Sequence, residues 1–219
     1  MKKIKESIKN INIVIGCNIG CSYCYARINN NRFHAINDFN KPVFFENKIK
    51  MLNSKKYMAY LLTGQSDLSG WDKEWIDKVF KCMNENKETA YIFLTKRPEN
   101  IKLNHVPSNG WFGVTVTSSK EKDRIVKIKE NIKSNHYHVT FEPMFDDIGN
   151  VDLTGIDWIV IGTETGSRKN KSVSKKEWVF NLYNQAHDKG IPVFMKEDLL
   201  GILEEKELMQ EFPKEFYNE

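Results

Sequence analysis

The sequence has no apolar run that approaches the roughly 20 residues a helix needs to cross a bilayer. Residues 1–10 also lack the pattern of a secretory signal peptide. We therefore expect a cytoplasmic protein without membrane contact, in a reducing compartment where thiols stay free to bind metal. No low-complexity tract interrupts the 219 residues, a length that fits a single domain over residues 1–219.

A strong charge bias is missing as well. The chain has 33 Lys and Arg against 29 Asp and Glu residues, a net charge of +4. This mild excess permits an anionic partner without requiring one, because a nucleic-acid footprint is recognised by clustering. The densest basic run consists of Arg168, Lys169, Lys171, Lys175 and Lys176. Such a run is usually a solvated face, but it also keeps a nucleotide or nucleic acid as the candidate substrate class.

Cysteine is scarce, and its distribution is uneven. Cys17, Cys21 and Cys24 follow the spacing C-x3-C-x2-C, whereas Cys82 stands alone in a helical pattern. Disulfide pairing would leave one of the three over, but three thiolates can bind one metal centre. A 4Fe-4S cluster normally takes four cysteines, so three would leave one iron open. We predict such a cluster, with zinc bound by the three cysteines and His34 as the alternative.

The cysteines lie in a loop, residues 16–25, that follows a short apolar segment at 11–15. This segment is rich in β-branched residues and predicts a buried strand. Gly16 and Gly20 lack a Cβ, which allows the backbone to wrap closely around a bulky group. Tyr23 places an aromatic ring immediately before the third thiol.

This C-x3-C-x-aromatic-C loop after an early strand resembles that of the radical S-adenosylmethionine (SAM) superfamily. The resemblance implies that Cys17, Cys21 and Cys24 hold a 4Fe-4S cluster whose open iron binds the amino and carboxylate groups of SAM. It further implies that an electron donor such as flavodoxin or ferredoxin reduces the cluster, which cleaves SAM to a 5′-deoxyadenosyl radical.

Short apolar segments alternate with amphipathic helical patterns beyond the cysteine loop, after a polar stretch at 29–41 that we expect to be a loop. Strands are predicted at 57–62, 91–94, 111–116, 137–141, 158–161 and 191–195, and helices at 44–52, 73–86, 120–132 and 175–189. This alternation predicts parallel β/α units. The expected fold is α/β, an incomplete TIM-like (β/α)6-7 barrel of the radical SAM type, with a doubly wound open sheet as the alternative.

Polar residues gather where the predicted strands end, which is where TIM-like barrels carry their working residues. The resemblance implies that Gly64, Ser66 and Asp67 receive the amino group of SAM. Lys96, with Arg97 beside it, suits the carboxylate of SAM. The set of expected cofactor-binding residues is Tyr23, Gly64, Ser66, Asp67, Lys96, Thr115, Ile161 and Gly162, of which the last two lie in the segment expected to pack on the adenine.

Glu142, Glu164 and Lys196 follow the later strands and are the candidate catalytic residues. A carboxylate buried at the barrel mouth needs a partner, so each could orient substrate or the SAM ribose, or form half of a structural ion pair. The segments at 94–98, 113–116, 141–143, 157–166 and 194–196 together resemble the phage- and mobile-element-associated three-Cys-motif radical-SAM-like family. That likeness implies no particular substrate.

Two other functions stay open. A zinc-stabilised nucleic-acid-binding module would use the same cysteines without turnover. A peptide-modifying radical SAM enzyme would work with a partner protein.

Overall fold

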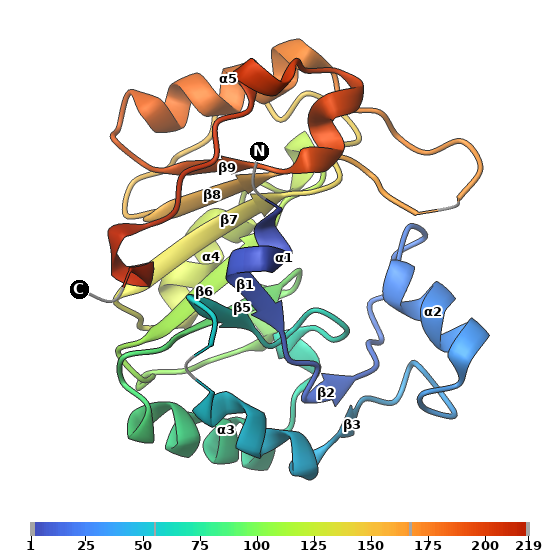
Figure 1. Ribbon diagram of the computed structural model, residues 1–219, viewed down its shortest axis with the longest axis vertical. Helices are drawn as coiled ribbons and strands as arrows, with labels where there is room; N and C mark the ends of the chain where they lie inside the picture. Colours follow the sequence, from blue (N-terminus) through green and yellow to red (C-terminus); the bar gives the residue numbers. More distant parts are fainter. Residues whose placement is uncertain (1–2, 55, 167, 218–219) are drawn as a thin grey trace.

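A computed structural model describes residues 3–54, 56–166 and 168–217. Met1, Lys2, Asn218 and Glu219, at the ends of the predicted domain, lie outside the described residues. A curled sheet of seven parallel strands forms a half-barrel (Figure 1). In spatial order the strands are β1 (Ile8–Asn10), β4 (Ala59–Leu61), β5 (Ala90–Thr95), β6 (Gly110–Thr115), β7 (His136–Phe141), β8 (Trp158–Ile161) and β9 (Val193–Met195).

Strand order follows chain order across the whole sheet. A doubly wound sheet would instead reverse its order at a switch point, so the open-sheet alternative is wrong. The α/β fold is confirmed, and the curled parallel sheet is compatible with an incomplete TIM-like barrel.

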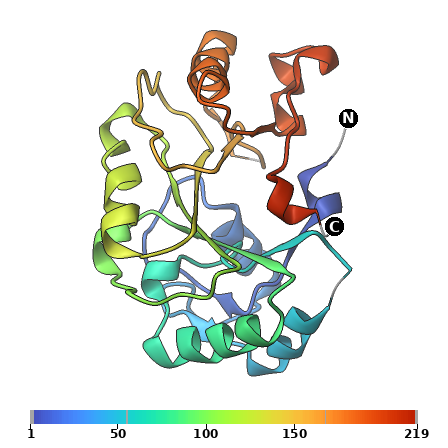
Figure 2. The same ribbon diagram turned by 90° about the vertical axis from the view of Figure 1, so that its left-hand side faces the viewer.

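Three helices cover the convex face of the sheet (Figure 2): α3 (Lys73–Glu85), α4 (Arg124–Asn131) and α5 (Lys176–His187). Each carries an apolar stripe at helical spacing, for example Ile76, Val79 and Met83 in α3, which are buried in the larger core cluster. All three were predicted, although α4 begins later than expected because a 3-10 turn at Ser119–Glu121 precedes it.

A second core cluster lies on the concave face. Trp111, Trp158 and Phe194 project from the strands, and Phe212 and Phe216 of the C-terminal segment pack against them. The short helix α1 (Ile4–Ser7) lies on the same side of the sheet, opposite the three large helices (Figures 1 and 2). The convex face is therefore covered by helices, and the concave face is covered in part by the C-terminal segment and α1.

The strand predicted at 11–15 is not a barrel strand. The first barrel strand is β1, and the chain then turns tightly at Asn12, where the Ile13 N–H donates to the Ile11 carbonyl at 2.9 Å. This turn sends β2 (Val14–Ile15) away to pair antiparallel with β3 (Val43–Phe44) in a separate small sheet. The apolar pattern correctly predicted that this segment is buried, but it did not indicate which sheet the strand joins.

The polar loop predicted at 29–41 is wrong over its first part, which continues the helix α2 (Tyr25–Phe33). Cys24 caps this helix, because its sulfur accepts a hydrogen bond from the Arg27 N–H at 3.4 Å. Asn30 is buried and bonds both the N–H and the carbonyl of Ile36 at 3.0 Å. Asn30 therefore braces the helix end instead of lying in a loop.

The helix predicted at 44–52 is a 3-10 helix over Glu46–Asn53. Among the described residues, no helix combines the length and the apolar character needed to cross a membrane.

Candidate functional site

A cavity of about 750 Å³ lies at the carboxyl ends of the barrel strands on the concave face. All three cysteines of the loop contribute to its wall. Most of the residues singled out from the sequence line it too: Tyr23, Gly64, Ser66, Asp67, Lys96, Thr115, Glu142, Glu164 and Lys196. The fold thus brings together side chains that lie up to about 180 positions apart in the chain.

Ile161 and Gly162 are the exceptions, because neither lines the cavity. The Ile161 side chain is fully buried in the core cluster on the convex face. Gly162 matters for a different reason: a Cβ there would lie 3.0 Å from Lys196 Cδ and 3.1 Å from Glu142 Cδ. Because Gly162 has no side chain, Lys196 and Glu142 can both pack closely against its backbone.

The cysteine loop depends on its first glycine. Gly16 has a φ of +114°, and a Cβ there would lie 2.8 Å from the Cα of Pro42. The Cys17 N–H donates to the Phe39 carbonyl at 2.7 Å, and Arg27 Nη2 donates to the Cys17 carbonyl at 2.9 Å. The backbone of this loop is therefore fixed by the protein while the thiols remain available.

The three thiols are partly exposed to the cavity. Burial raises the pKa of the Cys17 thiol to about 11, so its thiolate needs a positive ligand to form at neutral pH. Within the described residues, no three His, Cys, Asp or Glu side chains form a group that could hold a single metal ion. Three cysteine thiols that open into one cavity are nevertheless the ligand type that iron–sulfur clusters use.

His34 does not share this site. It follows the last residue of α2, whereas Cys24 precedes the first, so the two cap opposite ends of one helix. Ten residues of α-helical rise put their Cα atoms about 15 Å apart. Zinc–ligand bonds of about 2.0–2.3 Å cannot bridge that distance, so the two residues cannot bind the same zinc ion.

Two tyrosines lie at the cysteine end of the cavity. The Tyr23 ring packs edge-on against Phe145, with centroids 5.2 Å apart, and Lys96 Nζ lies 5.9 Å from the Tyr23 centroid. The Tyr25 hydroxyl donates to the Gly64 carbonyl at 2.6 Å. Burial raises the pKa of both hydroxyls, so both stay protonated.

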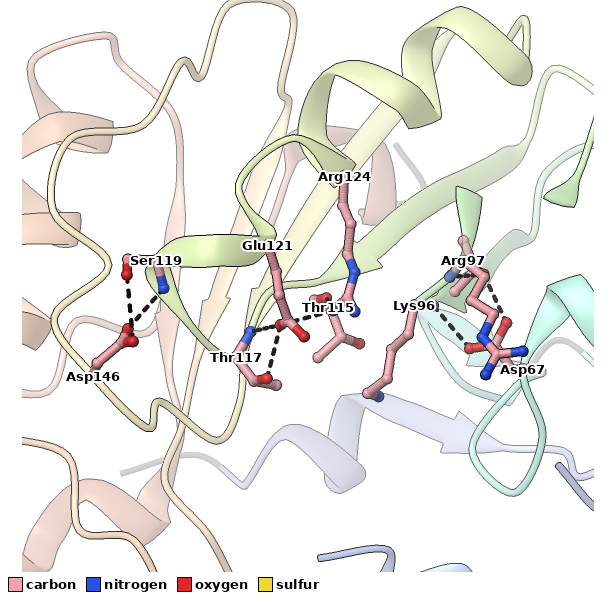
Figure 3. Close-up of polar contacts among 10 residues, drawn as sticks. Asp67, Lys96, Arg97, Thr115, Thr117, Ser119, Glu121, Arg124 and Asp146 are labelled. Atoms are coloured by element: carbon pink, nitrogen blue, oxygen red, sulfur yellow. Dashed lines mark hydrogen bonds and ion pairs between the residues drawn. The ribbon is translucent and has the colours of Figure 1, made fainter. Parts of the chain in front are cut away.

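Asp67 braces the loop after β4 against the end of β5 (Figure 3). Its Oδ1 accepts from the Ser69 N–H, the Ser69 hydroxyl and the Thr95 hydroxyl, and its Oδ2 accepts from the Lys96 N–H at 2.8 Å. The residue is 6 % exposed. With four donors already bound, its carboxylate has little capacity left for a ligand.

A second brace organises the loop after β6. Glu121 Oε2 accepts from both the N–H and the hydroxyl of Thr117 at 2.8 Å, and it pairs with Arg124 at 2.8 Å (Figure 3). Arg124 also donates to the Thr115 carbonyl at 2.8 Å. Lys96, by contrast, extends between the two braces without a carboxylate within 4 Å among the described residues.

Lys196 lies between two carboxylates after β9 and β7. Its ammonium pairs with Glu142 at hydrogen-bond distance and with Asp198 at 3.1 Å. Burial opposes the lysine charge, but the two carboxylates outweigh it and raise the lysine pKa. Burial also raises the pKa of Glu142, against the pull of Lys196. The group therefore carries one excess negative charge in a poorly solvated place, which favours uptake of a proton by Glu142.

Glu164 is held by its own loop. Arg168 binds both of its oxygens at 2.5 Å, and the Ser172 N–H donates to it at 3.0 Å. The Arg168 hydrogen bonds lower the pKa of Glu164. Glu164 was predicted either to orient the substrate or the SAM ribose or to form half of a structural ion pair. This geometry favours the structural ion pair.

His138 is a cavity residue to which the sequence assigned no role. It lies within β7, is fully buried, and reaches across β6 to place Nε2 3.0 Å from the Phe93 carbonyl of β5. Gly113 permits this, since a Cβ there would overlap the imidazole. Burial lowers the histidine pKa to about 4, so the ring is neutral at pH 7. A glycine opposite a histidine in paired strands was the only sequence signal.

Comparison with known proteins gives one match. The model of a family described as "Protein of unknown function (DUF5131)" covers residues 2–214. No curated protein and no solved structure matches the chain. A function has therefore to be inferred from the site itself.

Proposed function

We propose that this chain, which belongs to the DUF5131 family, is a radical SAM enzyme with a 4Fe-4S cluster held by Cys17, Cys21 and Cys24. The observation that carries the proposal is the shared cavity: three thiols on a fixed loop open into the space that the strand-end residues also line. The spacing of the cysteines alone did not require this convergence, because the cysteines and the strand ends are far apart in sequence, and it agrees with what the resemblance implies.

When bound, the cluster supplies one electron to SAM, whose sulfonium C–S bond breaks to leave methionine and a 5′-deoxyadenosyl radical. The protein supplies binding, orientation and exclusion of water. Gly16 and the bonds of Arg27 and Phe39 to Cys17 fix the backbone of the loop. The distance between Cys24 and His34 argues against the zinc-binding alternative.

The charge of the cavity suits a cationic ligand. Among the described residues that line it, three are basic (Lys5, Lys96, Lys196) and five are acidic (Asp67, Glu142, Glu164, Glu197, Asp198). SAM carries a positive sulfonium and a positive ammonium, so the acidic excess favours it over an anionic cofactor. Lys96, for which the described residues include no carboxylate within 4 Å, could bind its carboxylate.

The amino group of SAM is best served by the loop after β4. Gly64 lets this loop pack against two asparagines, because a Cβ would lie 2.9 Å from Asn10 Nδ2 and 3.0 Å from Asn12 Oδ1 and would displace these side chains. Ser66 accepts a hydrogen bond from Trp71 Nε1 at 3.0 Å and so has a fixed position. Asp67, with its four donors, acts on SAM by holding this loop in place.

Glu142 and Lys196 are the residues we assign to the substrate or to the SAM ribose. Lys196 stays protonated between its two carboxylates and can donate a hydrogen bond to a hydroxyl or carbonyl oxygen. Glu142 faces the cavity and can accept a hydrogen bond or take up a proton, because burial has already raised its pKa. Together they hold a polar group beside the cysteine end of the cavity.

A nucleotide or nucleic-acid substrate remains a prediction, and the basic run gives it limited support. Arg168 is bound to Glu164, Lys176 pairs with Glu207 at 2.5 Å, and Lys171 donates to the Gly166 carbonyl at 3.0 Å. A run whose charges are largely engaged within the protein has less capacity to bind phosphates than the sequence suggested.

The test is anaerobic purification, reconstitution with iron and sulfide, and incubation with SAM and dithionite. We expect a brown protein that contains iron and sulfide and forms 5′-deoxyadenosine. Each of Cys17→Ala, Cys21→Ala and Cys24→Ala should lower this rate at least 100-fold, whereas Cys82→Ala, at a thiol outside the cavity, should retain it. Stoichiometric zinc, or a colourless reconstituted protein with no 5′-deoxyadenosine, would refute the proposal.

A further inference from the structure

The cavity continues below the strand ends, into a part that neither the thiols nor the residues assigned to SAM occupy. Ile8, Leu61, Ile92, His138, Trp158 and Val160 line this deep part, which we call the cavity floor. His138 lies within β7, and Glu142 directly follows that strand four residues later, which places His138 about 13 Å below the rim. The cavity lining therefore reaches from the rim residues down to His138.

The chemistry of the floor differs from that of the rim. Four of its six residues are aliphatic, Trp158 is aromatic, and His138 is neutral at pH 7 because burial lowers its pKa to about 4. The acidic and basic lining residues other than Lys5 follow the ends of the strands, and Lys5 lies exposed on α1. A charged group placed on the floor would lose its hydration without gaining an ionic partner.

We propose that the cavity floor binds an uncharged apolar group of the substrate, of the size of an aromatic ring. An apolar cavity of this kind orients a ligand through a few polar groups at one end, here Glu142 and Lys196 at the rim. A substrate that carries phosphates would keep them outside the floor. This inference rests on the proposed function in one respect, that the ligand is called the substrate. The apolar character of the ligand follows from the residues that line the floor.

Two matched probes test this inference: phenol, an uncharged ring, and phenyl phosphate, the same ring with a dianion. Each is titrated calorimetrically into the anaerobic, cluster-loaded protein with SAM present. We expect phenol to bind at least 10-fold more tightly than phenyl phosphate. Equal affinities, tighter binding of phenyl phosphate, or no binding of phenol would overturn the proposal.

Substitutions locate the bound probe. Val160 lies on the floor and is 5 % exposed, so Val160→Trp should fill the space and weaken phenol binding at least 10-fold. Val173→Trp adds the same bulk at a valine that is 64 % exposed and should leave phenol binding unchanged. If Val160→Trp lowers the melting temperature so far that binding cannot be measured, Ile4→Trp on α1 makes the same test from the opposite wall.

Failure of this inference can be distinguished from failure of the proposed function. Cys17→Ala removes a cluster ligand but no residue of the floor, so this variant should still bind phenol while it forms no 5′-deoxyadenosine. Loss of phenol binding in a folded Cys17→Ala protein would place the probe at the cysteine end and overturn the inference. Absence of 5′-deoxyadenosine from the wild type, with phenol bound to the floor, would overturn only the proposed function.

Discussion

The strand-end rim and the cysteine loop border the same cavity but differ in how their polar groups are satisfied. At the rim, Asp67, Glu121 and Glu164 each bind several donors, and Lys196 lies between two carboxylates. In the loop, the backbone is held by hydrogen bonds, and the sulfurs have weaker partners: the Arg27 N–H for Cys24, the Ile19 backbone for Cys17 and the Tyr23 hydroxyl for Cys21. The rim is stabilised within the protein, whereas the loop presents thiols to an external ligand.

This contrast separates two consequences of substitution. Buried charges that satisfy one another are costly to break, because removing one leaves the other without a partner. Replacing thiols that make few bonds within the protein should lower activity but should change the free energy of unfolding little. Substitutions at the rim should therefore lower the free energy of unfolding most, and substitutions in the cysteine loop should lower it least.

Lys196→Met should have the largest effect. It removes the cation between Glu142 and Asp198 and leaves two buried carboxylates together, which should lower the free energy of unfolding by about 3–5 kcal/mol. Urea unfolding at pH 7 measures the loss. Glu142 would then titrate at a still higher pKa, so the variant should recover stability as the pH falls and Glu142 is protonated.

Lys176→Met is the matched control, since Lys176 pairs with Glu207 at the surface. Its expected cost is below about 1 kcal/mol. Equal losses for the two lysine variants would show that the rim group is no more important for stability than a surface pair.

His138 should make stability depend on pH. Its folded-state pKa of about 4 lies below the ordinary 6.5, so the unfolded chain binds a proton more readily. The wild type should therefore lose about 3 kcal/mol through this group as the pH falls from 6.5 to 4. His138→Gln cannot take up this proton, so its stability should fall less over the same range. Parallel curves for the two proteins would contradict the buried neutral histidine.

Gly162→Ala tests the close approach at the rim. The new Cβ would meet Lys196 Cδ at 3.0 Å and Asp198 Oδ1 at 3.2 Å, and displacing them should cost about 1–3 kcal/mol. Gly201→Ala is the control, because nothing lies within 4 Å of a Cβ at that position. Similar melting temperatures for Gly162→Ala and the wild type would show that the rim group accommodates a methyl group.

Glu164→Gln should loosen the loop that Arg168 closes, at a cost of about 1–3 kcal/mol at pH 7. The folded-state pKa of Glu164 lies below its ordinary 4.5, so its contribution is complete above pH 4.5 and is lost as the pH falls below that value. The difference between the two proteins should therefore shrink at low pH. Limited proteolysis near Gly166 provides a second measurement, with faster cleavage expected in the variant.

Replacing all three thiols of the loop by alanine should have the smallest effect on the cluster-free protein. The hydrogen bonds lost are weak ones to sulfur, from the Arg27 N–H to Cys24, from the Ile19 backbone to Cys17 and from the Tyr23 hydroxyl to Cys21. The free energy of unfolding should therefore change by less than about 2 kcal/mol. A loss as large as that of Lys196→Met would show that the thiols support the fold, and the contrast between the two regions would fail.

Much of this architecture could be predicted from the sequence. Apolar segments and amphipathic stripes located α3, α5 and all the barrel strands except β1. The buried strand predicted at 11–15 is present only at Val14–Ile15 and joins the small sheet, because the turn at Asn12 depends on a hydrogen bond that composition does not indicate. Helix α2 was missed because polar Asn30 is buried through bonds to Ile36, a residue outside the helix.

The site divides in the same way. The cysteine spacing and the positions at strand ends identified most of the cavity lining. The partners of those residues were not visible: Asp198 beside Lys196, the use of Asp67 as a brace, and His138 across Gly113. The direction of the Ile161 side chain was not visible either, because it depends on which face of β8 meets the helices.

The sequence by itself determined the alternation of strands and helices and the grouping of three cysteines in one loop. Both can be recognised from the spacing of residues that lie close together in the chain. Only the tertiary structure decided that the thiols, the rim charges and an apolar floor share one cavity. The physical reason is that side-chain periodicity is a local property, whereas the pairing of charges and the shape of a cavity depend on strands brought together by curling of the sheet.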